Sequence, residues 1–218
     1  DVLYNAIYGK KGYGRNILGS AKNVKGFTRA DIENYKAKYY HPENIVVAFA
    51  GGIDFDLAER LTDKYFASLK RGGCVAPARS TEFSSGVATK KKKIEQTHFA
   101  IGFPSISRDD PLADAMQTFN GVFGGGMSSR LFQEVREKLG LAYSVYSYIS
   151  SYEDCGNLVV YAGVNPAKAE NALSAIGKCI DELKKGGISD DEFVRGREQM
   201  KSSLLFSQES TSAQMLMY

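Results

Sequence analysis

The amino-acid sequence predicts an α+β fold with a mostly antiparallel sheet and helices packed on one face of it. Two observations lead to this prediction. The second part of the chain reads, in order, as strand, helix, helix, strand, strand, helix and helix. Its last two strands are separated by a short turn, which is too little chain for the crossover that joins parallel strands. The first part reads as helix, strand and helix, which is again an α+β pattern.

The first part opens with an apolar-periodic segment, residues 1–8, that predicts the end of a helix. Residues 9–27 carry five glycines and little periodicity, so they predict an ordered loop. Thr28 and Asp31 then have the spacing of a capping box and open a helix that ends at His41.

A short apolar run, residues 44–50, predicts a strand that is buried on both faces. Asp54 is the expected N-cap of the helix that follows it. Periodicity disappears between residues 71 and 93, where Gly, Ser, Ala and Lys dominate. This pattern predicts an interdomain linker that runs into an edge strand. The four lysines at 90–93 are expected to flank the strand in solvent, where their charges discourage edge-to-edge pairing with another sheet. The alternative interpretation is that they bind an anion.

The second part begins with residues 96–103, which alternate like a half-buried strand. Asp110 and Pro111 open a helix that runs to Phe123. Residues 157–164 predict a strand that pairs with the preceding one as an antiparallel hairpin.

Two helices are predicted to close the sequence. Pro166 begins a long helix that ends at the glycines 186 and 187. Ser189 and Glu192 form a capping box that opens the last one.

The most distinctive stretch runs from Phe123 to Ser147. Its three consecutive glycines, 124–126, interrupt helical structure because each costs about 1 kcal/mol relative to Ala in a helix. Ser128 or Ser129 is the expected N-cap of the helix that follows.

That helix is predicted to turn one apolar stripe, formed by Leu131, Val135 and Leu139, toward a core. Gly140 is its expected C-cap, after which the period of two predicts a strand. The pattern places Arg136 on the last turn of the helix and Tyr143 early in the strand.

Composition excludes several classes of function. The 218 residues are 43% hydrophobic and 24% charged, which is ordinary for a globular protein. A net charge of +3, with basic residues spread along the chain, makes nucleic acid an unfavoured partner. The sequence shows neither a membrane span of about 20 apolar residues nor a secretory signal pattern. Three distant cysteines without a CxxC pattern fit a reducing cytoplasm, and Cys179 is expected to lie inert in the core.

The common catalytic and metal motifs are also missing. The sequence contains neither HExxH nor HxxEH, and its two histidines, His41 and His98, have no carboxylate at ligand spacing. Each histidine is therefore expected to have a packing or helix-capping role rather than to bind a metal. The glycine triplet lacks the Lys of a phosphate loop, and no nucleophile elbow surrounds the two serines after it. Arg136 and Tyr143 remain, and from residue types alone they are either a surface charge and a core aromatic or a functional pair.

Several segments together resemble the pitrilysin family of zinc metallopeptidases, in its two-domain bacterial and processing-peptidase branch. The segments are GYGRNILGS, FTRADIENYKAKYYHPENIVVAFAGGID, GGGMSSRLFQEVREKLGLAYSV and FVRGREQMKSSLLFSQES. The resemblance covers nearly the whole chain in the family's order. It implies a zinc-dependent endopeptidase built from similar α+β domains around a chamber, with zinc held by HxxEH and a more distal glutamate.

The resemblance implies that this sequence starts after those ligands. Residues 1–70 would be the C-terminal part of the first domain, 71–93 the linker, and 94–218 the N-terminal part of the second, so that both domains are half-complete. No catalytic or metal-binding residue can be transferred to this chain, which alone is expected to be inactive and to hold no zinc. Arg136 and Tyr143 match the family's R-x6-Y pattern, which implies substrate binding.

Two functions follow from the resemblance. In the first, the chain is part of a zinc-dependent metalloendopeptidase that acts on peptides or unfolded proteins. Its expected partners are then the substrate, the missing N-terminal zinc-binding part, and a second copy or paired subunit. In the second, the chain is a non-catalytic partner or structural subunit of the same fold. Neither nucleic acid nor a membrane is an expected partner, and a bacterial cytoplasm is the expected location.

Overall fold

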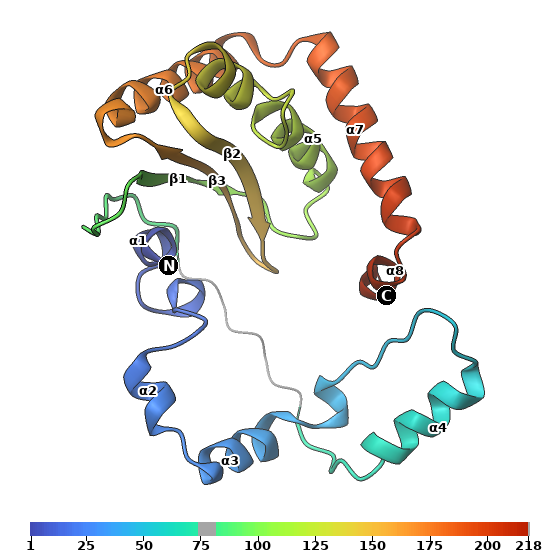
Figure 1. The fold of residues 1–218 in the computed structure, drawn as a ribbon. Coiled ribbons are helices and arrows are strands. Elements are labelled where there is room, and N and C mark those ends of the chain that lie inside the picture. Colours follow the sequence, from blue (N-terminus) through green and yellow to red (C-terminus); the bar gives the residue numbers. More distant parts are fainter. Residues whose placement is uncertain (74–81, 218) are drawn as a thin grey trace. The chain divides into compact units, whose positions relative to one another are not determined.

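The computed structural model describes residues 1–73 and 82–217. These residues form two compact units (Figure 1). The first, the sheet unit, contains residues 1–15 and 82–202, and the second, the helical unit, contains residues 16–73 and 203–217.

The sheet unit contains three antiparallel strands, β1 (Thr97–Ser105), β2 (Ala142–Ser151) and β3 (Gly156–Val164). Their order is β1-β3-β2, so that β3 lies in the centre. Each strand lies close to its predicted range, and β2 and β3 form the predicted hairpin. The α+β fold with an antiparallel sheet is confirmed.

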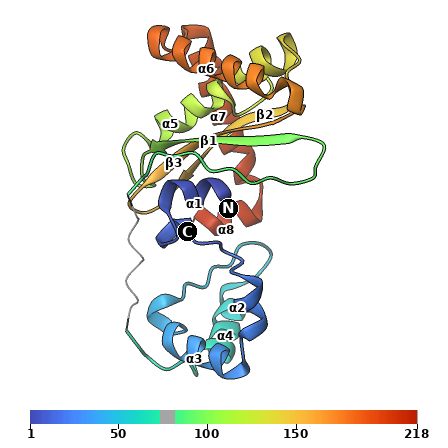
Figure 2. The ribbon, with the colours of Figure 1, turned by 90° about the vertical axis from the view of Figure 1, so that its left-hand side faces the viewer.

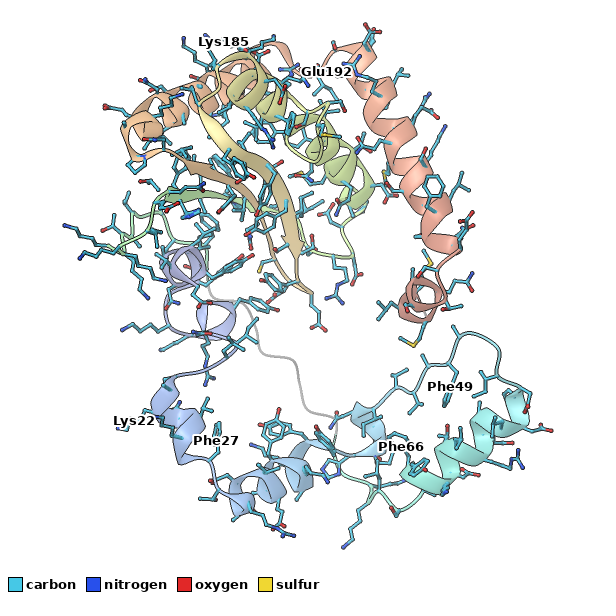
Figure 3. All side chains as sticks on the ribbon, viewed as in Figure 1. Lys22, Phe27, Phe49, Phe66, Lys185 and Glu192 are labelled. Atoms are coloured by element: carbon cyan, nitrogen blue, oxygen red, sulfur yellow. The ribbon has the colours of Figure 1, made fainter. Side chains whose placement is uncertain are left out.

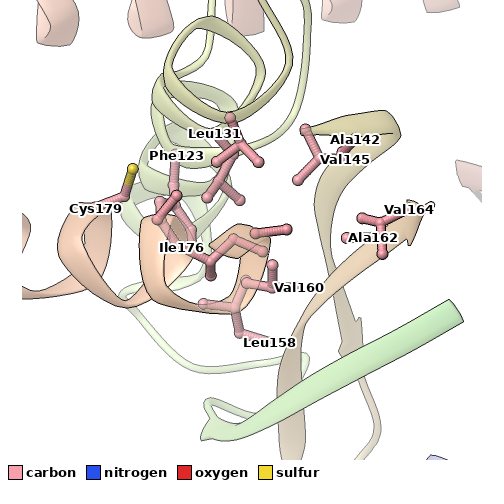
Figure 4. Close-up of a cluster of buried hydrophobic side chains, with 13 residues drawn as sticks. Phe123, Leu131, Ala142, Val145, Leu158, Val160, Ala162, Val164, Ile176 and Cys179 are labelled. Carbon is pink, nitrogen blue, oxygen red and sulfur yellow. The ribbon is translucent and has the colours of Figure 1, made fainter. Parts of the chain in front are cut away.

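One face of the sheet carries the hydrophobic core, because every second residue of β3 turns toward the helices (Figure 4). The helices are α5 (Ala113–Phe123), a π-helical turn η3 (Phe132–Lys138) and α6 (Ala169–Gly186). The buried side chains that form this core include Phe123, Leu131, Val135, Val145, Val160, Val164, Ile176 and Cys179.

The opposite face is covered at one end by α1 (Val2–Tyr8) (Figure 2). The Tyr8 hydroxyl donates to Oδ1 of Asn157 at 3.1 Å, and the Tyr4 hydroxyl lies 2.9 Å from Oγ of Ser150. Burial raises the pKa of Tyr8. The N-terminal helix is thus held to the sheet by tyrosines as well as by the buried Ile7.

The C-terminal part is helical, as predicted. Asn165 caps a short 3-10 turn, η4 (Pro166–Lys168), which leads into α6. The capping box opens α7 (Asp190–Gln208): the Ser189 N–H donates to Glu192 Oε2 at 2.8 Å, and the Glu192 N–H donates to Ser189 Oγ at 3.3 Å. A last short helix, α8, spans Thr211–Met217.

The prediction for residues 9–27 was wrong in part. This range contains a 3-10 turn, η1 (Gly12–Gly14), and a helix, α2 (Ala21–Gly26), in addition to loops. Oγ of Ser20 accepts a hydrogen bond from the Asn23 N–H at 3.1 Å, so a local cap forms a helix that apolar periodicity does not mark.

The remaining helices of the helical unit follow their local signals. The predicted capping box of Thr28 and Asp31 opens α3 (Arg29–Tyr39), and a 3-10 turn, η2 (Pro42–Asn44), follows it. The Asp54 side chain accepts from the Leu57 N–H at 2.7 Å at the start of α4 (Phe55–Phe66), as predicted.

The strand predicted for residues 44–50 is wrong. Residues 45–50 form neither helix nor strand, and Val46 is 86% exposed. A strand needs a neighbouring strand to satisfy its backbone. The described part of the helical unit offers only helices and loops, and its large aromatic side chains such as Phe27, Phe49 and Phe66 are partly or largely exposed (Figure 3).

The predicted linker, residues 71–93, lies partly outside the described residues, which resume at 82. Residues 82–93 contain no helix or strand, and the four lysines at 90–93 are exposed. The division of the chain at 70 and 94 stays a prediction. Within the described residues, no helix is long and apolar enough to cross a membrane.

Candidate substrate-binding site

The glycine triplet forms a tight turn between α5 and η3. The N–H groups of Gly124 and Gly125 both donate to the Asn120 carbonyl, at 2.9 and 2.8 Å. The Ser147 N–H donates to the Gly124 carbonyl at 3.0 Å, so the turn lies directly against strand β2. A Cβ added to Gly124 would collide with Ser147, which explains why glycine is needed there.

Ser129, rather than Ser128, takes the buried position at the start of the next helical turn. Its hydroxyl donates to the Gly126 carbonyl at 2.5 Å, and the Phe132 N–H approaches Oγ of Ser129 at 3.5 Å. This serine therefore ties the glycine turn to η3, and its role is structural.

The segment that carries Arg136 is a π-helical turn instead of the predicted α-helix. The Leu139 N–H donates to the Glu134 carbonyl, five residues back, at 3.2 Å. Because this turn is wider than an α-turn, a stripe of residues spaced four apart drifts away from the core as the turn proceeds. The predicted stripe holds for Leu131 and Val135, which are buried, but fails for Leu139, which is 54% exposed.

Gly140 ends the turn with a φ of 56°, in the left-handed region predicted for it. Strand β2 then begins with an irregularity. Ala142 pairs with Val164 and Ser144 pairs with Gly163, so Tyr143 is an extra residue without a partner on β3. Such a β-bulge interrupts the regular alternation of side chains between the two faces of the sheet and redirects one of them. Tyr143 is 76% exposed, although the period of two would have placed it on the buried side with Val145.

The two irregularities bring Arg136 and Tyr143 together. The guanidinium carbon of Arg136 lies 5.8 Å from the centroid of the Tyr143 ring and 4.8 Å from that of Phe132. These distances fit cation–π contacts. Glu137 is 3.8 Å from Nε of Arg136, which is longer than a hydrogen bond, and 41% of the arginine side chain is exposed. The structure therefore places the two predicted residues side by side at the surface.

A hollow of about 230 Å³ lies next to this pair. It is lined by Gly124–Gly126, Met127, Phe132, Arg136 and Ser144–Tyr146. Most of this lining is apolar or bare backbone, and Arg136 supplies the positive charge. The hollow is large enough for one amino-acid side chain. Of its lining residues, the glycine triplet and Arg136 stood out in the sequence.

An ion pair fixes the start of this segment. Nε and Nη2 of Arg130 donate to the two carboxylate oxygens of Glu192 at 2.5 and 2.6 Å, and Nη2 also donates to the Gly187 carbonyl at 2.9 Å. The two side chains are only 20% and 16% exposed. The hydrogen bonds from Arg130, followed by those from Ser189, lower the pKa of Glu192 to about 2. The sequence pattern identified Glu192 as a capping residue, but it did not reveal the ion pair with Arg130.

The histidines do not form a metal site. Nδ1 of His98 lies 2.7 Å from the Tyr161 hydroxyl, and Nδ1 of His41 lies 3.0 Å from the Lys70 carbonyl. Among residues 1–73 and 82–217, no group of three or more His, Cys, Asp or Glu side chains is placed to hold a metal ion. Cys179 is buried as predicted, and burial raises the pKa of its thiol. The described residues therefore do not fit a zinc ion, whose binding needs three or four convergent ligands.

A comparison with known families defines the class of protein. The family profile described as "Peptidase M16 inactive domain" matches residues 26–200. The chain therefore belongs to the M16 peptidase family. The resemblance drawn from the sequence motifs is confirmed.

Individual relatives agree with this assignment. The chain is 38% identical over 215 residues to "Uncharacterized zinc protease YmxG" of Bacillus subtilis and 37% identical over 225 residues to "Uncharacterized zinc protease SCO5738" of Streptomyces coelicolor. These matches cover 99% of the chain but 52% and 49% of the relatives. The chain thus spans about half the length of the curated relatives it matches.

Solved structures show the same fold. The peptidase M16 inactive domain from Pseudomonas fluorescens matches with a TM-score of 0.84 and 28% identity, over 92% of this chain and 49% of that one. A protease from Helicobacter pylori matches with a TM-score of 0.84 and 25% identity, over 96% of this chain and 52% of that one.

Proposed function

We propose that this chain is the substrate-binding part of a zinc-dependent metalloendopeptidase that cleaves peptides or unfolded proteins. The observation that carries the proposal is the pairing of Arg136 and Tyr143, 5.8 Å apart beside a hollow. Two backbone irregularities, the π-helical turn and the β-bulge, create this pairing. Such irregularities are frequent at functional sites.

The chemistry of the pair suits a peptide bond. The guanidinium of Arg136 offers a planar fork of donors to the carbonyl oxygens of an extended peptide. The Tyr143 hydroxyl can donate to the oxyanion that develops when the carbonyl carbon is attacked. The zinc ligands would come from a part of the parent protein outside this sequence, so the residues described here orient the substrate and stabilise charge.

The hollow adds a preference among substrates. Met127, Phe132 and Val145 offer apolar contacts to a substrate side chain, and the guanidinium of Arg136 repels a cationic one. We therefore infer that the hollow accepts apolar or acidic side chains better than lysine or arginine.

The partners proposed for the chain are the N-terminal zinc-binding part of the parent protein and, beyond it, a second copy or a paired subunit. The relatives named zinc protease support the first of these. A cytoplasmic location is part of the same proposal.

The proposal is tested by comparing the complete parent protein with this chain alone. The parent should contain zinc by elemental analysis and cleave a fluorogenic peptide library, and a chelator should abolish cleavage. This chain alone should cleave nothing. A parent that holds no zinc and cleaves nothing, while still binding peptides or a related subunit, would instead support the non-catalytic role.

A further inference from the structure

A row of small and polar residues crosses the sheet on the face opposite the core. His98 on β1 and Ser144 on β2 both stand opposite Gly163 of the central strand β3. In the next row, Ala100 and Tyr146 both stand opposite Tyr161. Helix α1 covers the other end of this face, where Ile7 contacts Gly102, and His98 and Ala100 are exposed.

Gly163 is buried in the middle of this row, beneath polar side chains. At the place of its missing Cβ, Oγ of Ser144 would lie at 3.1 Å, Oε1 of Gln96 at 3.2 Å and Nδ1 of His98 at 3.4 Å. Three polar side chains therefore gather over the backbone of Gly163, and His98 remains exposed among them.

His98 and Tyr161 form a hydrogen-bonded pair within these two rows, with 2.7 Å between Nδ1 and the hydroxyl oxygen. When the tyrosine donates to Nδ1, the ring proton lies on Nε2. When the imidazole is charged, both nitrogens carry protons. In both of these states Nε2 presents an N–H donor, which suits a carbonyl oxygen.

The two rows share residues with the hollow beside Arg136. Ser144 and Tyr146 line the hollow and also belong to the two rows. The rings of Tyr146 and Tyr161 lie 4.9 Å apart with an angle of 34° between them. Neighbouring strands are about 4.8 Å apart, so the path from β2 to β1 is about 10 Å, the length of about three extended residues.

We propose that His98, Tyr161 and Ser144 form a second subsite that binds the main chain of the same extended peptide, about three residues away from the residue in the hollow. This subsite rests on the proposed function, because its occupant is the peptide held by Arg136 and Tyr143. The exposed imidazole donates to a peptide carbonyl at the surface of the sheet, and the rings of Tyr146 and Tyr161 stack on an aromatic side chain of the peptide.

The test uses the full chain, which contains no tryptophan, so that a single tryptophan in a peptide reports its own binding by fluorescence. The probes are a tryptophan-containing tripeptide, too short to reach from the hollow to His98, and an unstructured dodecapeptide with tryptophan scanned along it. His98→Ala and Tyr161→Phe should each weaken dodecapeptide binding about three- to tenfold, as expected for one lost hydrogen bond, and leave tripeptide binding unchanged.

The matched controls are His41→Ala and Tyr65→Phe, which lie in the helical unit and should change neither affinity. Arg136→Lys should weaken both peptides. Unchanged dodecapeptide binding in the His98 and Tyr161 variants, with an effect of Arg136→Lys, would overturn the second subsite and leave the proposed function standing.

The converse result, effects at His98 and Tyr161 but none at Arg136, would support the subsite and remove the role proposed for the arginine. Failure of the wild-type chain to bind either peptide would overturn both. Circular dichroism of each variant separates lost binding from lost folding.

Discussion

The sheet unit and the helical unit are built from similar local signals but differ in burial. In the sheet unit, Val135 and Ile176 are completely buried between helices and strands. In the helical unit, α2, α3 and α4 form from their own N-caps and contain no buried residue. A local cap thus marks where a helix begins, whereas burial requires a second layer for the helix to pack on.

The largest expected difference between the units concerns core truncation. Ile176→Ala should lower the free energy of unfolding of the sheet unit by about 2–5 kcal/mol, because it removes buried atoms and leaves a cavity. Ile32→Ala on α3 should change stability by less than about 0.5 kcal/mol, because Ile32 is exposed. Urea unfolding of both variants measures the difference. Equal losses of stability in the two variants would contradict the proposed difference in burial between the units.

The next largest effect belongs to the partly buried ion pair of Arg130 and Glu192. The folded pKa of Glu192, about 2, lies below its ordinary value of 4.5, so the ionised pair stabilises the fold above about pH 4.5. This shift corresponds to about 3 kcal/mol, which is lost as the pH falls toward 2.

Glu192→Gln should therefore destabilise the sheet unit at pH 7, and its difference from wild type should shrink between about pH 5 and 2. Glu198→Gln is the control, because that carboxylate also pairs with cations but its side chain is 52% exposed. Chemical unfolding across this pH range measures both. A difference for Glu192→Gln that does not change with pH would argue against the ion pair.

The smallest effect is expected at the capping box of α3. Thr28→Ala removes the oxygen that accepts the Asp31 N–H and should cost about 0.5–2 kcal/mol of local helix stability. Faster amide exchange confined to α3, with unchanged exchange in β3, is the expected result of hydrogen-exchange measurements. Faster exchange throughout β3 would mean that the two units unfold together.

The sequence predicted those features that a few neighbouring residues determine. The capping boxes at Thr28 and Ser189 and the left-handed Gly140 all depend on side chains or backbone angles within one turn. The hairpin of β2 and β3 was also predicted, because a short turn and two alternating runs define it.

Features that depend on distant partners were not predicted. Residues 44–50 have the composition of a buried strand, but the described residues around them supply no strand to pair with. The ion pair between Arg130 and Glu192 joins residues that are far apart in the chain, so no local pattern reveals it.

The candidate site shows the same limit. R-x6-Y identified Arg136 and Tyr143, but neither the π-helical turn nor the β-bulge that brings them together was expected. Strict alternation would place Tyr143 on the same side as Val145, and only the pairing with β3 shows the extra residue. The structure thus supplies the physical reason why these two side chains share one surface.

The most direct test of the central claim measures kcat/KM of the complete parent peptidase with Arg136→Lys and Tyr143→Phe. Lysine keeps the charge but loses the donor fork, and phenylalanine keeps the ring but loses the hydroxyl. Removing one oxyanion donor typically costs about a hundred- to thousandfold in turnover, so we expect each variant to lose at least about tenfold in activity, with zinc content and melting temperature nearly unchanged. Arg197→Lys and Tyr35→Phe are the matched exposed controls and should keep full activity. Near-normal activity in both test variants would contradict the account, and activity lost together with stability would make the two residues structural.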